Sequence, residues 1–264
     1  MNTEKVTNHI IDWLRTYAKN AKVNGFVIGI SGGIDSAVTS TLCAKTGFPT
    51  LCVEMPIHQA EIQINRGKEH IIQLEERFEN VSSEEVELTS VFESFKSAVP
   101  KTKSSPKVDL SLANTRARIR MTTLYYFAGL HGLLVAGTGN KVEDFGVGFY
   151  TKYGDGGVDL SPIADLMKSE VYELAAYLQV PESIQDAQPT DGLFGDSRTD
   201  EDQLGASYDE LEWAMRMVEA GKNADNLKGR EKEVFEIFTK LNRANKHKMV
   251  EIPVCKVNKD LKKS

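Results

Sequence analysis

The fold is decided by Phe26-Val27-Ile28-Gly29-Ile30-Ser31-Gly32-Gly33-Ile34-Asp35-Ser36-Ala37-Val38, where an apolar run breaks into small residues and then resumes at helical spacing. This pattern predicts a strand, a tight turn and a helix. Gly32 and Gly33 have no Cβ atom, so the turn can adopt positive φ and let a bulky anion approach the backbone amides. The first-turn amides of the following helix lack intrahelical partners, and the helix dipole adds positive potential. A phosphate group is therefore the natural occupant of the turn.

The polar residues of this turn indicate which kind of phosphate loop it is. Ser31 and Ser36 add hydroxyl donors, whereas the Asp35 carboxylate would repel a phosphate unless a cation lay between them, so Asp35 implies Mg²⁺. A Walker loop is excluded because no lysine follows Gly33, and the glycine spacing differs from the dinucleotide fingerprint. A merely structural turn would explain one glycine, but not the whole Ser-Gly-Gly-x-Asp-Ser block.

The block resembles the pyrophosphate loop of the N-type ATP pyrophosphatases, which adenylylate a substrate and release pyrophosphate. That family includes NAD synthetases, GMP synthetases, asparagine synthetases and tRNA-modifying enzymes. The loop alone does not choose among them.

Length, charge and cysteine usage bound the class of protein. A chain of 264 residues is long enough to bury a full core, and we expect residues 1–264 to form a single domain. The net charge of −6 argues against a broad nucleic-acid surface. Cys43, Cys52 and Cys255 are too few and too scattered for a disulfide framework or a zinc site. With no apolar leader and no stretch of membrane-spanning length, we expect a soluble cytoplasmic protein.

Apolar spacing along the chain predicts strands that alternate with helices, which is typical of a parallel sheet with nucleotide at the carboxyl ends of its strands. Two connections carry no such pattern. Residues 100–107 form a surface linker, and residues 181–205 form a long connection of the kind that is often a lid. Besides the strand and helix of the first loop, we expect helices at 4–19, 59–78, 91–99, 109–131, 208–218 and 230–245, and one that contains Val171, Leu174, Ala175 and Leu178. We expect strands at 48–56, around Val86 and Leu88, and at 133–136.

A second strand end carries similar chemistry. Leu133-Leu134-Val135-Ala136 runs into Gly137-Thr138-Gly139-Asn140, and the carboxyl ends of parallel strands meet at one edge of a sheet. Glu143 would be an exposed helix-start residue if taken alone. Beside Asp35 it becomes the second carboxylate for the metal, because Mg²⁺ is typically held by one or two carboxylates plus substrate phosphates.

Residues 149–159 read Phe-Tyr-Thr-Lys-Tyr-Gly-Asp-Gly-Gly-Val-Asp, which does not match a core element. A plain surface loop would leave its aromatic side chains in water. In a ligand loop they stack on a ring while aspartate and lysine bind hydroxyls and phosphate. We therefore favour a ligand loop here, whereas Lys168, taken alone, would be solvated.

Taken together, several stretches resemble bacterial ammonia-dependent NAD synthetase, in the right order and over most of the chain. The resemblance is to the ammonia-dependent form, since we expect no N-terminal nitrilase-like domain of the kind that glutamine-using relatives carry. It also departs from many relatives, which have Thr-Asp-His-Ala-Ala-Glu where this chain has residues 138–143. The stretches are residues 31–36, Ala117-Arg118-Ile119-Arg120-Met121, Gly137-Thr138, Glu143, residues 149–159, Pro189-Thr190 and His247-Lys248.

The resemblance implies a doubly wound α/β fold with a mainly parallel, five-stranded sheet flanked by helices, of the adenine nucleotide α-hydrolase-like, Rossmann-like class. It also implies a homodimer with the dinucleotide at the subunit interface. The residue roles that it implies are ATP binding by Gly29, Ile30, Ser31, Gly32, Gly33, Ile34, Asp35, Ser36, Thr138, Lys168 and Thr190; deamido-NAD binding by Arg118, Lys152, Asp159, His247 and Lys248; metal binding by Asp35 and Glu143; and catalysis by Asp35, Lys168 and Asp155, the last orienting or deprotonating ammonium.

The activity that the resemblance implies is the last step of NAD biosynthesis, catalysed by a ligase that forms a carbon–nitrogen bond. The nicotinate carboxylate of deamido-NAD attacks the α-phosphate of ATP, pyrophosphate leaves, and ammonia then displaces AMP. Mg²⁺, the loop amides and Lys168 would offset charge on the phosphates. Two alternatives remain open: a GMP-forming or tRNA-modifying pyrophosphatase with the same first loop, and a nucleotide sensor that binds ATP without turnover.

Overall fold

The computed structural model describes residues 1–190, 192–193 and 199–262. At its centre lies a parallel sheet of four strands in the order β3-β2-β1-β4. The strands are β1 (Gly25–Ile30), β2 (Thr50–Glu54), β3 (Val81–Glu85) and β4 (Leu133–Val135). The first βαβ unit is as predicted, because β1 is followed by a loop and then by helix α2 (Ile34–Ala44).

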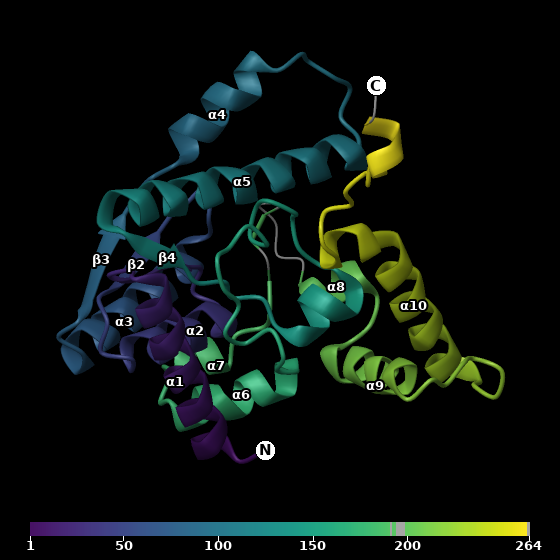
Figure 1. The fold of residues 1–264 in the computed structure, drawn as a ribbon, viewed down its shortest axis with the longest axis horizontal. Helices are drawn as coiled ribbons and strands as arrows, with labels where there is room; N and C mark the ends of the chain where they lie inside the picture. The colour runs from purple at the N-terminus through teal and green to yellow at the C-terminus, as the bar shows by residue number, and fades with distance from the viewer. Residues whose placement is uncertain (191, 194–198, 263–264) are drawn as a thin grey trace.

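Helices cover both faces of the sheet (Figure 1). One face packs against α1 (Thr3–Ala21), α2, α3 (Glu61–Arg77) and α6 (Lys168–Tyr177) through a core that includes Leu14, Phe26, Val38, Leu74 and Leu174. The other face packs against α4 (Thr89–Ala98) and the long helix α5 (Pro106–His131) through a core that includes Val27, Val53, Phe92 and Ala128. A sheet covered on both faces explains why β1 and β2 are apolar without alternation.

A third core lies beside the sheet and joins the C-terminal helices to a π-helix, η1 (Val142–Val147). Asn242 Nδ2 donates to Gly146 O at 2.6 Å and Asn245 Nδ2 donates to Val147 O at 2.9 Å. The last α-helix, α10 (Gly229–Met249), is therefore hydrogen-bonded directly to η1. This core contains residues of α8 (Asp200–Leu204), α9 (Tyr208–Glu219) and α10. The short helix α7 (Glu182–Gln185) packs instead in the first core through Ile184, and a 3-10 helix, η2 (Lys259–Lys262), lies near the C-terminus.

The prediction of five strands was wrong by one. Residues 158–160 run beside β4, but only the single bridge Ala136↔Leu160 forms there. The Asp159 carboxylate accepts the Val135 N–H at 2.8 Å, while the Asp159 N–H donates to Val135 O at 3.0 Å. A side chain thus takes the backbone donor that a fifth strand would use.

Several predicted boundaries also differ. The third strand is Val81–Glu85, so Val86 and Leu88 lie just after it. The 181–205 connection contains α7 and α8, although Asp191 and residues 194–198 of that prediction lie outside the described residues. Helix α5 begins at Pro106, inside the predicted linker, and α10 extends to Met249, so that His247 and Lys248 lie in its last turn. None of the described helices is both long and apolar enough to cross a membrane.

Candidate functional site

The loop between β1 and α2 is held in shape by its own hydroxyl groups. Ser36 Oγ donates to Gly33 O at 2.9 Å and lies 3.1 Å from Ser31 Oγ, which in turn accepts the Gly33 N–H at 3.2 Å. Gly32 has a φ of +76°, and a Cβ atom there would lie 2.3 Å from Gln63 O in α3. Gly32 therefore serves close packing against α3, whereas Gly33, with a φ of −100°, adopts extended backbone as the N-cap of α2.

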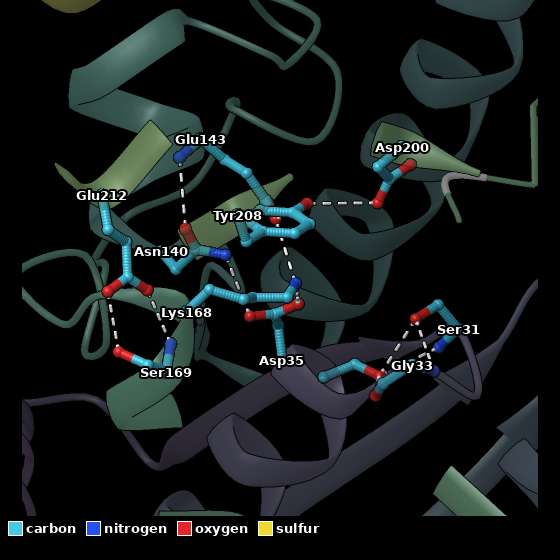
Figure 2. Close-up of polar contacts among 11 residues, drawn as sticks. Ser31, Gly33, Asp35, Asn140, Glu143, Lys168, Ser169, Asp200, Tyr208 and Glu212 are labelled. Carbon is cyan, nitrogen blue, oxygen red and sulfur yellow. Dashed lines mark hydrogen bonds and ion pairs between the residues drawn. The ribbon is translucent and has the colours of Figure 1, made fainter. Parts of the chain in front are cut away.

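Two carboxylates and one lysine meet beside this loop, as Figure 2 shows. Lys168 Nζ lies 2.6 Å from Asp35 Oδ2 and 3.0 Å from Glu143 Oε1. Asp35 comes from α2, Glu143 from η1 and Lys168 from the first turn of α6, so three segments far apart in the sequence supply the cluster. Asn140 fastens it, because its Nδ2 donates to Asp35 Oδ1 at 3.1 Å and its Oδ1 accepts the Glu143 N–H.

Burial and mutual charge set the protonation of this cluster. Burial would lower the pKa of the Lys168 ammonium, but the two carboxylates outweigh it and raise that pKa. Burial raises the pKa of Asp35, against the effect of Lys168. Burial acts in the same direction on Glu143, but the Lys168 charge and the Tyr208 hydrogen bond outweigh it, so the pKa of Glu143 is lowered. Lys168 is thus a permanent cation between two acidic groups.

The donor set fits Mg²⁺. Both carboxylates already converge on one cationic atom, Lys168 Nζ. Within the described residues, no group of three or more His, Cys, Asp or Glu side chains is arranged to hold a metal ion. Mg²⁺ does not need such a cage, since it is usually bound by one or two carboxylates together with waters and substrate phosphates. Asp35 and Glu143 could supply such a carboxylate pair, and their role as magnesium ligands stays a prediction.

Tyr208 and Glu212 of α9 belong to the same network, and no local sequence pattern marks either of them as a site residue. The Tyr208 hydroxyl donates to Glu143 Oε1 at 2.6 Å, lies 3.3 Å from Asp200 Oδ2, and its ring is 4.7 Å from Lys168 Nζ. Glu212 is buried and accepts the Ser169 N–H and the Ser169 hydroxyl, both at 2.8 Å (Figure 2). It therefore fixes the turn of α6 that carries Lys168.

A cavity of about 260 Å³ opens in front of this cluster. Most of the residues predicted to bind ATP line it: Gly29, Ile30, Ser31, Gly33, Ile34, Asp35, Ser36, Thr138, Lys168 and Thr190. Gly32 does not, because it faces α3. The cavity thus brings together the two strand ends, the first turn of α6 and the 187–190 stretch that follows α7.

The 149–159 loop contributes to one side of the cavity. Phe149 and Tyr150 line it, whereas Tyr153 is exposed, with a φ of +61°. Asp155 also lines it, and burial raises the pKa of this carboxyl group to about 6, although its Oδ1 accepts the Thr151 N–H at 2.9 Å. The loop thus places both aromatic and acidic groups against the cavity, and its role in binding a ligand stays a prediction.

Asp144 is a further acidic residue of the cavity that the sequence analysis did not single out. Burial, together with the Glu143 and Asp155 charges, raises the pKa of its carboxyl group to about 8. A Cβ atom at position 139 would lie 2.2 Å from both Asp144 oxygens. Glycine at position 139 thus leaves room for the Asp144 carboxyl group, which would have to move if residue 139 carried a side chain.

The residues predicted to bind the dinucleotide separate into two groups. Arg118 Nη2 donates to Lys152 O at 3.3 Å and Lys152 Nζ donates to His247 O at 2.8 Å, so α5, the loop and the end of α10 meet there. Lys248 lies close by, since its Nζ donates to Tyr150 O at 2.7 Å. Asp159 stands apart from these four, because its carboxylate accepts the Tyr125 hydroxyl at 2.9 Å and ties α5 to the sheet.

Comparison with known proteins gives consistent matches over nearly the whole chain. A family model described as NAD synthase matches residues 6–252. The NH(3)-dependent NAD(+) synthetase of Mesoplasma florum is 39% identical over 240 residues, which cover 90% of this chain and 93% of that protein. The NH(3)-dependent NAD(+) synthetase of Archaeoglobus fulgidus is 35% identical over 257 residues, which cover 97% of this chain and 98% of that protein. The solved structure of NMN synthetase from Francisella tularensis superposes with a TM-score of 0.84 at 30% identity, covering 97% of this chain and 100% of that one.

Proposed function

The chain belongs to the NAD synthase family, and on that premise we propose how its site carries out the ATP-dependent amidation of deamido-NAD by ammonia, which yields NAD, AMP and pyrophosphate. One observation carries the proposal: Lys168 Nζ bridges Asp35 and Glu143 beside a phosphate loop, at the edge of a cavity that the loop lines. Lysine and a metal-binding carboxylate pair next to loop amides are the groups that adenylyl transfer needs.

In the first step, the nicotinate carboxylate attacks the α-phosphorus of ATP and the bond to the leaving pyrophosphate breaks. Ser31, Ser36 and the first-turn amides of α2 would hold the phosphates, with Lys168 beside them and Thr138 and Thr190 at the cavity wall. Asp35 and Glu143 would hold Mg²⁺, which supplies positive charge to the phosphate oxygens when bound. The residues together keep the reacting groups aligned and offset the charge that develops on the leaving group.

In the second step, ammonia attacks the acyl carbon of the adenylate and AMP leaves with the bonding electrons. The attacking nitrogen must lose protons, and ammonium is the main form of ammonia at neutral pH. Asp155 is a suitable group to orient ammonium or take its proton, since it lines the cavity and burial raises its pKa to about 6.

Arg118, Lys152, His247 and Lys248 would bind the dinucleotide, since they lie together and the first, second and fourth of them bring positive charge to one place. Asp159 would contribute to dinucleotide binding indirectly, by holding α5 in place through Tyr125.

We further propose a homodimer, which the apolar side chains exposed along α5 support: Leu110, Tyr126 and Leu130 are more than half exposed. Residues 1–264 would act as one catalytic domain. Three free thiols suit a cytoplasmic location.

A second candidate substrate is nicotinate mononucleotide, which the similarity to the Francisella NMN synthetase supports. The reacting carboxylate is the same in both substrates, and only the adenylate half of the dinucleotide differs. Selectivity would therefore depend on contacts remote from the Asp35, Glu143 and Lys168 cluster.

One assay tests these proposals. The purified protein is incubated with ATP, MgCl₂ and ammonium chloride, and with either deamido-NAD or nicotinate mononucleotide, and the amide product, AMP and pyrophosphate are quantified. We expect NAD, AMP and pyrophosphate in equal amounts, and a higher kcat/KM for deamido-NAD. Asp35→Asn should lose activity by about 100-fold or more. ATP binding without pyrophosphate release would favour a nucleotide sensor, and full activity of Asp35→Asn would contradict the assigned cluster.

A further inference from the structure

Three basic side chains line the cavity within the described part of the chain: Arg66, Arg120 and Lys168. Two of them are already engaged. Lys168 is held by two carboxylates, and Arg120 donates to Met55 O at 2.9 Å and to Gln59 Oε1 at 2.7 Å. A triphosphate that entered the cavity would find the charge of Lys168 already balanced by Asp35 and Glu143.

Arg66 is in a different state. Its Nε atom is buried and has no hydrogen-bond partner, and no hydrogen bond or ion pair joins its side chain to the described residues. Glu54 lines the same cavity but forms no ion pair with it. Burial lowers the pKa of the guanidinium, although arginine remains charged. A partly buried cation without a partner is costly, so its surroundings are complete only when an anion binds.

The backbone places Arg66 next to the phosphate loop. The close approach of Gly32 to α3 is made at Gln63 O and at Gly67 N, with distances of 2.3 and 3.2 Å from the position of a Cβ atom. Arg66 lies in the helical turn between those two atoms. The turn that packs against the loop therefore also carries a guanidinium to the cavity.

We propose that Arg66 is a phosphate-binding residue for ATP, which donates its N–H groups to oxygens of the phosphate chain. The guanidinium fork matches phosphate oxygens bidentately, which a lysine cannot do. The inference rests on the proposed use of ATP, but not on the identity of the substrate that is amidated.

Binding measurements test the inference without turnover. Calorimetry with ATP and MgCl₂, in the absence of deamido-NAD, is compared with adenosine, which has no phosphate, for the wild type, Arg66→Met and Arg66→Lys. We expect Arg66→Met to weaken ATP binding by about 10- to 100-fold, as for lost hydrogen bonds to a charged group, and to leave adenosine binding within about twofold. Arg66→Lys should lie between, because it keeps the charge and loses the fork.

Lys68→Ala is the matched control, since Lys68 comes from the same helix but pairs with Glu85 at the surface, 3.0 Å away. It should leave both affinities unchanged. Wild-type ATP affinity in Arg66→Met, or an equal loss of ATP and adenosine binding, would overturn the inference. If Arg66→Met does not fold, Arg66→Lys must still weaken the binding of ATP more than the binding of adenosine. A wild type that binds ATP but forms no amide would refute the proposed function and leave the Arg66 comparison intact.

Discussion

The Lys168 ammonium group lies between the carboxylates of Asp35 and Glu143, which are both largely buried and would otherwise face each other. Replacing it by methionine keeps the stem and removes the charge. We expect Lys168→Met to lower the free energy of unfolding at pH 7 by about 3 kcal/mol, because it leaves the buried carboxylates unpaired, and to abolish amidation. Urea denaturation and the product assay measure the two effects.

Lys141→Met is the control for this change. Lys141 also contacts two carboxylates, Asp165 at 3.6 Å and Glu219 at 3.2 Å, but both acids are exposed. Its loss should cost less than about 1 kcal/mol. Equal costs for the two substitutions would mean that the Lys168 cluster is solvated like a surface ion pair.

His70 links the α2 and α3 helices, because its Nε2 lies 2.8 Å from Ser40 Oγ. Burial lowers the pKa of His70 from the ordinary 6.5 to about 4, and the Arg77 charge adds to the shift. Between those pH values the unfolded chain binds the proton more readily than the folded one. The stabilisation that the neutral His70 contributes to the free energy of unfolding is therefore complete above pH 6.5. It is lost as the pH falls toward 4, by about 3 kcal/mol in total.

The measurement is the free energy of unfolding of the wild type and of His70→Gln at several pH values between 4 and 7. The difference between the two proteins should change in favour of the wild type as the pH rises through this range. A difference that does not depend on pH would contradict the buried, neutral state of this imidazole.

The sequence predicted site residues where a local pattern announces them. Asp35 and Glu143 follow the carboxyl ends of two strands, and such ends meet at one edge of a parallel sheet. Their convergence could therefore be predicted from the sequence. Tyr208 and Arg66 were not, because each lies in an ordinary amphipathic helix and acts through a contact with a distant segment. The capping residues Ser207 and Glu210 predict where α9 begins, but they do not predict the contacts of its first residue, Tyr208.

At the scale of elements, the loop before α2 depends on a packing contact as well as on its dihedral angles. Gly32→Ala must both adopt a φ of +76° and place a Cβ atom 2.3 Å from Gln63 O. We expect it to cost more than about 3 kcal/mol and to weaken ATP binding, since α3 must move away from the loop.

Gly47→Ala isolates the cost of the positive φ from the cost of the contact with α3. Gly47 has a nearly equal φ of +78°, but nothing lies within 4 Å of its Cβ position. It should cost only about 1–2 kcal/mol, the strain of the left-handed conformation. Thermal and urea denaturation of both variants give the comparison, and similar losses would rule out the contact with α3 as a cause.

The elements that could be predicted were those with strong periodicity. The two buried strands and the long helices have this periodicity, and their type and order were predicted correctly, although several of their ends differ by a few residues. The edge strand Val81–Glu85 reads Val-Ser-Ser-Glu-Glu and is mostly exposed, so its residues carry no apolar signal. The π-helix η1 and the missing fifth strand depend on tertiary hydrogen bonds, those from α10 and that of Asp159, which no local pattern encodes.

At the scale of the whole molecule, the site lies where the core of the sheet meets the core of the C-terminal helices. Leu14 of α1 and Leu211 of α9 are both completely buried, one in each core. Leu14→Ala and Leu211→Ala should each cost about 2–5 kcal/mol, the usual range for such cavities. Only Leu211→Ala should also lower kcat of the folded protein, because α9 carries Tyr208 and Glu212 to the site.

This comparison requires both variants to be assayed well below their melting temperatures. Circular dichroism establishes the folded fraction, and the product assay gives kcat. If Leu14→Ala lowers kcat as much as Leu211→Ala does, then the two cores do not contribute separately to the geometry of the site.

The lysine between the two carboxylates has a consequence for the order of events at the start of turnover. In the resting enzyme one ammonium group already offsets part of the negative charge of the acidic pair, so a bare divalent ion gains less by approaching it. Asp35 and Glu143 would hold magnesium in place of the Lys168 ammonium group when the nucleotide brings its own anionic oxygens to the ion. We therefore expect magnesium and nucleotide to enter as one preassembled complex, and free magnesium to associate weakly with the resting protein.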